Sequence, residues 1–130
     1  MVLFKHMLQK TTDKKEKLAI TMAKIEEIFA STFRQIAMYE FEKEAHELRS
    51  TQGELPSKQL NAIWKKQQRR MFGDALYITE SESPYWSLIP HLFHTPFYVY
   101  SYAFGELLTL SLFSLYEKSP EGFAEKYMDF

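Results

Sequence analysis

Apolar residues recur at steps of three and four over most of this chain, which is the spacing of amphipathic α-helices. The segment "MVLFKHMLQK" carries this pattern without a capping residue of its own, so it resembles the tail of a helix that began earlier. Asp13 and Glu16 then form a capping-box arrangement. An apolar stripe follows it: Leu18, Met22, Ile25, Phe29, Phe33 and Ile36. We expect one long helix from there to a stop near Gly53.

The second half of the chain predicts three more helices. "GELPS" breaks the chain, and Pro56 suits a first helical position because its missing N–H would be unpaired there anyway. The helix "SKQLNAIWKKQQRRMF" should end at Gly73 and direct four apolar residues toward a core: Leu60, Ile63, Trp64 and Phe72. After the polar connector "GDALYITESESP", we expect a helix from about Phe97 to Tyr116 and a short one capped by Ser119 and Pro120. The fold class is therefore all-α.

Composition limits the possible functions. Sixteen basic and seventeen acidic residues give a net charge of −1, so no overall field attracts nucleic acid or an anionic membrane. The chain has no cysteine, which excludes thiolate metal clusters and thiol nucleophiles and fits a reducing cytoplasm. The N-terminal segment lacks the features of a secretory signal. We expect a cytoplasmic protein that binds neither nucleic acid nor membrane.

The segment "IPHLFHTPFYVYSYAFGELLTLSLF" at residues 89–113 allows three interpretations. A membrane span from Phe97 to Leu115 would place Glu106 near its centre, at a cost of about 2.5 to 3.5 kcal/mol, which disfavours that interpretation. A core helix explains the second half, whose apolar stripe is Phe97, Phe104, Leu108, Leu112 and Leu115. The first half is better explained as a site, because buried tyrosine hydroxyls need partners.

Tyrosine hydroxyls and a histidine N–H are donors that can stabilise a developing oxyanion. On a helix, Tyr98 and Tyr102 share a face, whereas Tyr100 points away by about 200°. His91 precedes Pro96 in a loop or turn that can fold back over that face. This set offers no nucleophile.

Three other motifs favour ordinary structural roles. His91 and His94 have metal-ligand spacing but no identifiable third ligand. "HELRS" at residues 46–50 begins like the zinc motif HExxH but has Ser50 in place of the second histidine, so a solvated helix end is favoured. "KKQQRR" at residues 65–70 has no interleaved aromatic residues, which favours a solvated face over a phosphate-binding patch.

Longer segments carry a resemblance to a known family. "IPHLFHTPFYVYSYAFGELLTLSL" resembles the C-terminal signature of the oligoendopeptidase F branch of the thimet-oligopeptidase family of zinc metallopeptidases. "FASTFRQIAMYEFEKEAHEL", "GEL" and "FGDAL" are similar to the last third of that family in the same order. The likeness covers essentially all 130 residues.

The resemblance implies an all-helical bundle with a deep channel that cleaves short peptides with one zinc ion. Residues 1–130 would be a single partial domain, the C-terminal third of the catalytic domain, without the HExxH helix or the third zinc ligand. The resemblance assigns His91, Tyr98 and Tyr102 to substrate contact and oxyanion stabilisation, and makes Tyr100 a lesser candidate for substrate binding. The family pattern has an aromatic residue at the position of His94, so this chain differs from the pattern at a residue that would contact the substrate.

Two hypotheses follow. In the first, the chain is the C-terminal part of a zinc oligoendopeptidase and is active only with a partner that carries the zinc site. In the second, it is a non-catalytic helical remnant or a peptide- or protein-binding module. Both predict that the chain alone is inactive. Its long amphipathic helices should leave an apolar face uncovered, which predicts self-association or a partner.

Overall fold

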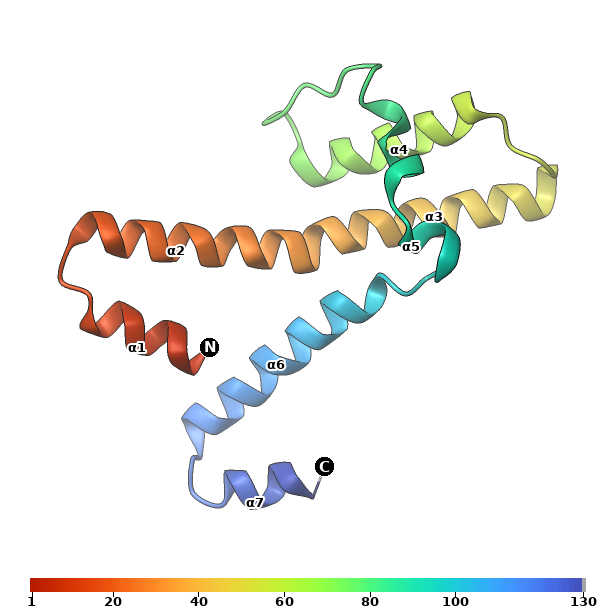
Figure 1. Ribbon diagram of the computed structural model, residues 1–130. Helices are drawn as coiled ribbons and strands as arrows, with labels where there is room; N and C mark the ends of the chain where they lie inside the picture. Colours follow the sequence, from red (N-terminus) through yellow and green to blue (C-terminus); the bar gives the residue numbers. More distant parts are fainter. Residues whose placement is uncertain (130) are drawn as a thin grey trace. The chain divides into compact units, whose positions relative to one another are not determined.

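The computed structural model describes residues 1–129, and these residues form helices joined by turns without any β-strand (Figure 1). This confirms the all-α fold class. The described chain divides into two compact units. We call residues 29–103 the central unit, and residues 1–28 with 104–129 the terminal unit. The assignment of the chain to one partial domain stays a prediction.

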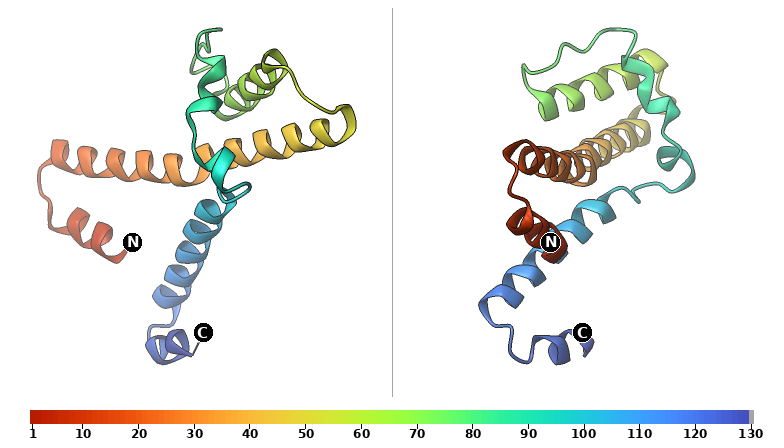
Figure 2. Two further views of the ribbon diagram at one scale, coloured as in Figure 1. Left: turned by 45° about the vertical axis from the view of Figure 1, so that its right-hand side comes forward. Right: turned by 60° about the vertical axis from the view of Figure 1, so that its left-hand side comes forward.

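The central unit is built on two helices that pack side by side, α3 (Arg34–Gln52) and α4 (Ser57–Phe72), as both views of Figure 2 show. The 3-10 helix η2 (Ser83–Leu88) packs against α4, and the short helix α5 (His91–His94) follows it. The main cluster of the buried core consists of Met38, Phe41, Ile63, Trp64, Ile89 and Val99. Aromatic packing holds this core together, because the ring of Phe41 meets Trp64 edge to face at 5.4 Å.

Helix α4 ends where its sequence predicts, and Ile63 and Trp64 are buried as expected. Gly73 ends the helix with a positive φ of 57°, which glycine adopts without steric cost, and its N–H donates to the carbonyl of Arg69 at 2.8 Å. The prediction for Pro56 was wrong by one residue. Pro56 is the N-cap, with an extended ψ of 148°, because a residue that only flanks the helix keeps non-helical angles.

The predicted long helix is present but is not a uniform α-helix. Asp13 caps it, since the Lys15 N–H donates to Asp13 Oδ1 at 3.1 Å. α2 (Lys14–Ile28) leads into a π-helix, η1 (Phe29–Phe33), and then into α3, which ends at Gly53 with a φ of 82°. In the wide π-turn, the Gln35 side chain donates to the carbonyl of Ala30 at 3.3 Å.

The terminal unit comprises α1 (Val2–Lys10), α2, most of α6 (Tyr100–Lys118) and α7 (Phe123–Met128). Lys5 of α1 forms an ion pair with Glu117 of α6, and its ammonium lies 4.9 Å from the centre of the Phe113 ring. None of the described residues of this unit is fully buried. The predicted core stripe is exposed at Phe104 and Leu115 and only half-buried at Leu108 and Leu112.

The last helix begins later than predicted. Ser119 and Pro120 do not cap it: the Ser119 N–H donates to the carbonyl of Leu115 and so belongs to the end of α6. The carbonyl of Pro120 accepts from Phe123, forming a turn. Gly122, with a φ of 68°, is the N-cap of α7, because glycine adopts this left-handed angle without steric cost.

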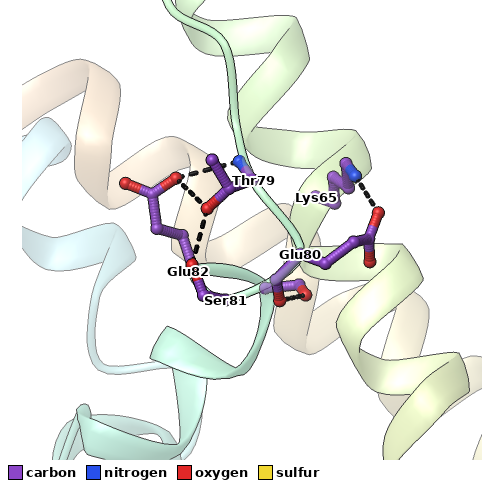
Figure 3. Close-up of polar contacts among 6 residues, drawn as sticks. Lys65, Thr79, Glu80, Ser81 and Glu82 are labelled. Atoms are coloured by element: carbon purple, nitrogen blue, oxygen red, sulfur yellow. Dashed lines mark hydrogen bonds and ion pairs between the residues drawn. The ribbon is translucent and has the colours of Figure 1, made fainter.

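The connector between α4 and η2 is ordered by its own side chains (Figure 3). One carboxylate oxygen of Glu82 accepts from the N–H of Thr79 at 2.9 Å and from its hydroxyl at 2.8 Å. Glu80 forms an ion pair with Lys65 of α4. The segment that the sequence predicts as a polar connector is therefore tied to the helix that precedes it.

Candidate functional site

The three residues assigned to catalysis, His91, Tyr98 and Tyr102, lie together in the central unit. The imidazole of His91 stacks on the Tyr98 ring at 5.9 Å with an interplanar angle of 9°. Tyr102 stands edge-on to both, with ring centroids 6.2 Å from His91 and 5.5 Å from Tyr98. We call these three side chains the donor cluster. Each ring therefore packs against the other two.

The donor cluster is built differently from the expected helix face. Helix α6 starts at Tyr100, so Tyr98 lies in the preceding turn, and the predicted start at Phe97 was wrong. The reason is Phe97 itself, whose φ of 62° no α-helix accommodates. The carbonyl of Tyr98 accepts a hydrogen bond from the Ser101 N–H at 3.0 Å, and this bond joins the turn to the first residues of α6.

Both tyrosines of the donor cluster remain accessible. Tyr98 is 48% exposed and Tyr102 is 36% exposed. Within residues 1–129, neither hydroxyl forms a hydrogen bond with another side chain or the backbone. The hydroxyls are therefore available as donors to a molecule outside the chain, as oxyanion stabilisation requires.

The turn before α6 rests on a buried carboxylate that the sequence analysis missed. The N–H of Phe97 donates to Glu42 Oε1 at 2.9 Å, and Glu42 is only 2% exposed. The other oxygen of Glu42, Oε2, is buried and has no partner among the described residues. Burial raises the pKa of Glu42, while the Phe97 hydrogen bond and the charges of His46 and His91 act to lower it.

The other two candidates lie apart from the donor cluster. His94 ends α5 and is exposed, and Tyr100 begins α6 with 58% of its surface exposed. In the described part of the chain, neither ring packs against the donor cluster. A role in substrate binding stays a prediction for both residues.

The two motifs interpreted as solvated helix surface make more contacts than expected. His46 is exposed, yet its ring lies 4.9 Å from that of Phe97. The basic run of α4 is paired with acids: Lys65 with Glu80, Lys66 with Glu44 at 2.8 Å, and Arg70 with Glu40 at 3.6 Å. Two of these ion pairs connect α4 to α3. All three neutralise basic side chains that a phosphate-binding patch would need.

The residues present do not make a zinc site. No group of three or more His, Asp or Glu side chains within residues 1–129 is arranged to hold a metal ion. Among these described residues, His91 and His94 therefore have no third ligand beside them. We also find no helix in this part of the chain that is long and apolar enough to cross a membrane.

Comparison with known proteins places the chain among the metallopeptidases. It belongs to peptidase family M3, whose model matches residues 1–128. Members of this family are peptide-hydrolysing, zinc-dependent enzymes. The family predicted from the sequence is thus confirmed.

Two relatives carry names that match the predicted branch. The chain is 29% identical over 129 residues to the oligoendopeptidase F homolog of Borreliella burgdorferi, covering 99% of this chain and 22% of that protein. It is 30% identical over 130 residues to the oligopeptidase PepF of Bacillus subtilis, covering 99% of this chain and 19% of that protein. The chain thus spans about a fifth of the length of the curated relatives it matches. No solved structure matches the chain.

Proposed function

We propose that this chain supplies the substrate-binding wall of an oligopeptidase active site, in which His91, Tyr98 and Tyr102 donate hydrogen bonds to the oxyanion formed during peptide hydrolysis. The single observation that carries the proposal is the donor cluster, with three donor side chains in mutual contact and tyrosine hydroxyls unused within the described chain. Donors fixed before the reaction stabilise charge that develops in the transition state.

The chemistry of the cluster defines its part in the reaction. When a water molecule adds to a peptide carbonyl, the carbonyl oxygen becomes negatively charged. The hydroxyls of Tyr98 and Tyr102 and one N–H of His91 can each donate to that oxygen. Removing one such donor typically lowers the turnover rate about a hundred- to a thousandfold. No step that needs zinc is assigned to residues of this chain.

Hydrolysis would then need a second component. We propose that the chain works with the zinc-binding part of a family M3 catalytic domain, on a short peptide substrate. The exposed apolar side chains of the terminal unit support such a contact, since large uncovered apolar surfaces usually mark interaction sites. Without that part, we expect the chain to be inactive on peptides and to self-associate.

A complementation experiment tests this proposal. The chain is mixed with a family M3 oligopeptidase from which the matching segment has been deleted, and cleavage of a quenched fluorescent peptide is followed with and without a zinc chelator. We expect chelator-sensitive cleavage only in the mixture. A folded, associated mixture that cleaves nothing would contradict the proposal.

Substitutions separate oxyanion stabilisation from simple binding. Tyr102→Phe removes one hydroxyl and should lower kcat about a hundred- to a thousandfold while changing KM little. Tyr77→Phe is the matched control, because Tyr77 lies in the connector and is 86% exposed. Equal changes in kcat and KM for Tyr102→Phe would instead indicate contact with the substrate before reaction.

A second candidate function is a non-catalytic module that binds peptides or a partner protein. The exposed apolar surface of the terminal unit is the observation that favours it. This candidate predicts that the mixture above binds peptide without cleaving it, and that Tyr102→Phe changes only the dissociation constant.

A further inference from the structure

The turn that carries Tyr98 adopts a backbone conformation that its own sequence disfavours. Phe97 has a φ of 62°, and it is the one non-glycine residue of the described chain with a positive φ. Bulky residues rarely adopt this region because the side chain crowds the backbone, so surrounding structure must hold them there. Phe97 lies directly before Tyr98, so its angles set the direction in which the Tyr98 side chain leaves the turn.

One face of α3 holds this turn through three contacts. Glu42 Oε1 accepts the Phe97 N–H at 2.9 Å. The Phe97 ring packs edge-on against Tyr39 at 6.0 Å and lies tilted against the His46 ring at 4.9 Å. Tyr39, Glu42 and His46 are three and four residues apart, so they project from one side of the helix. This face acts as a cradle for Phe97.

Glu42 is the unusual member of the cradle. It is 2% exposed, and the Phe97 N–H is the one hydrogen-bond donor that its carboxylate receives within residues 1–129, because Oε2 has no partner. An incompletely paired buried carboxylate is a poor way to stabilise a core, since an apolar residue of similar size would avoid the desolvation cost. Its presence at this point needs another explanation.

We propose that Glu42 is a positioning residue: by holding the N–H of Phe97, it keeps the turn in its left-handed conformation and so keeps Tyr98 stacked against His91 and beside Tyr102. The catalytic part of this inference rests on the proposed function above. The geometric part, that Glu42 orients the donor cluster, stands apart from any activity.

The geometric part is tested by NMR on the chain labelled at its histidine and tyrosine rings. The wild-type chain should show cross-relaxation between the His91 and Tyr98 rings. Glu42→Leu should lose it, whereas Glu42→Gln, which keeps an acceptor oxygen, should retain it. The control is Glu47→Leu, an exposed position on the same helix. Retention in Glu42→Leu, or loss in Glu42→Gln, would overturn the proposal.

A purely structural role predicts a different result. If Glu42 merely stabilised the fold, Glu42→Leu would lower the thermal unfolding midpoint, and the ring contacts would weaken in proportion. We expect the contacts to be lost with no fall in the midpoint, because leucine removes a buried and incompletely paired carboxylate. If the unfolding midpoint of Glu42→Leu falls and the ring contacts weaken in proportion to that fall, the positioning role would be overturned.

Two measurements apply even if Glu42→Leu does not fold. The Phe97 amide of the wild-type chain should be protected from hydrogen exchange, and exchange at the rate of an open amide would overturn the proposal. Phe97→Gly removes the steric cost of the positive φ. The ring contacts of the donor cluster should therefore be as well ordered in Glu42→Gln combined with Phe97→Gly as in Glu42→Gln by itself. Disordered contacts in the double variant, with ordered contacts in Glu42→Gln, would contradict the argument that Phe97 is strained.

Activity in the complemented mixture separates the two proposals. Glu42→Leu should lower kcat about ten- to a hundredfold with little change in KM, the size expected when a catalytic group is misplaced by about 1 Å. Wild-type kcat in this variant would overturn the positioning role in catalysis and leave the proposed function standing. An inactive wild-type mixture with intact ring contacts would overturn the proposed function and leave the geometric part standing.

Discussion

The central and terminal units are built from helices with similar apolar spacing, yet they differ in what happens to their apolar side chains. In the central unit, Phe41, Trp64 and Val99 are almost fully enclosed. In the terminal unit, the apolar residues of α2 and α6 are half or more exposed at several positions, including Leu18 and Leu115. The difference shows that periodicity identifies the apolar face of a helix, whereas burial depends on a second element that covers this face.

The largest expected effect concerns the core of the central unit. Trp64→Ala removes a buried ring that packs against Phe41, and should lower the free energy of unfolding by about 3 to 5 kcal/mol. Leu115→Ala in the terminal unit should change it by no more than about 0.5 kcal/mol, because Leu115 is largely exposed. Urea unfolding followed by circular dichroism measures both. Similar losses for the two variants would erase the contrast between the units.

The exposed face of α2 should govern association of the chain. Met22→Glu combined with Ile25→Glu places two charges on that face and should weaken self-association at least about tenfold, because each apolar side chain buried in a contact contributes about 1.5 to 3 kcal/mol. Sedimentation velocity over a range of concentrations gives the dissociation constants.

The matched control for association adds the same charge at polar, exposed positions of the terminal unit. Thr12→Glu combined with Ser114→Glu provides this control. If both double variants weaken association equally, general charge repulsion explains the effect, and the apolar face of α2 does not.

A smaller effect should appear in the pH dependence of the central unit. Because burial raises the pKa of Glu42, the folded chain holds this proton more tightly than the unfolded chain. The contribution of Glu42 to stability is thus greatest below its ordinary pKa and falls as the pH rises through the raised pKa. His46 and His91 face this carboxyl and oppose the shift.

Glu42→Gln tests this pH dependence, since its side chain carries no charge at any pH. The variant should become more stable relative to wild type as the pH rises from the acid range to neutrality. Glu121→Gln, at an exposed position of the terminal unit, should show no such trend. Free energies of unfolding at several pH values provide the comparison. A difference between Glu42→Gln and wild type that does not vary with pH would contradict the prediction.

The smallest effect concerns the surface connector of the central unit. Two hydrogen bonds from Thr79, first the backbone N–H and then the hydroxyl, lower the pKa of Glu82. A carboxyl group with a lowered pKa stabilises the fold at pH values above its ordinary pKa. This stabilisation is lost as the pH falls through the lowered pKa. Thr79→Val removes the hydroxyl alone, so carbon NMR should show the Glu82 pKa rising only part of the way to its ordinary value. A full return would mean that the backbone bond contributes nothing.

Local sequence patterns predicted the helical fold well. The end of α4 before Gly73 and the cap at Asp13 were predicted correctly, because apolar spacing, glycine stops and capping side chains act within a few residues. The π-helix η1 was missed, since nothing in Phe29–Phe33 breaks the apolar spacing. An uncovered apolar face was expected on the long helices, but the α6 stripe itself was assigned to a core and is exposed at Phe104 and Leu115, because spacing does not reveal which face a second element covers.

The site shows the same division between local and distant causes. Spacing alone selected Tyr98 and Tyr102, and the structure does bring them together with His91. The reason for their contact was wrong, however, because Tyr98 lies in a turn outside the helix. That turn depends on Glu42, 55 residues away, and no local pattern signals either the positive φ of Phe97 or its distant acceptor.

The hydrogen bond between Glu42 and Phe97 also has a consequence for the order of folding. It closes a loop of 55 residues, whereas α3 and α4 are neighbours in sequence and can pair across the short "GELPS" connection. Contacts between distant residues cost more chain entropy to form than contacts between neighbours, and they tend to form later. We therefore expect the α3 and α4 pair to assemble first and the donor cluster to acquire its geometry in one of the last steps.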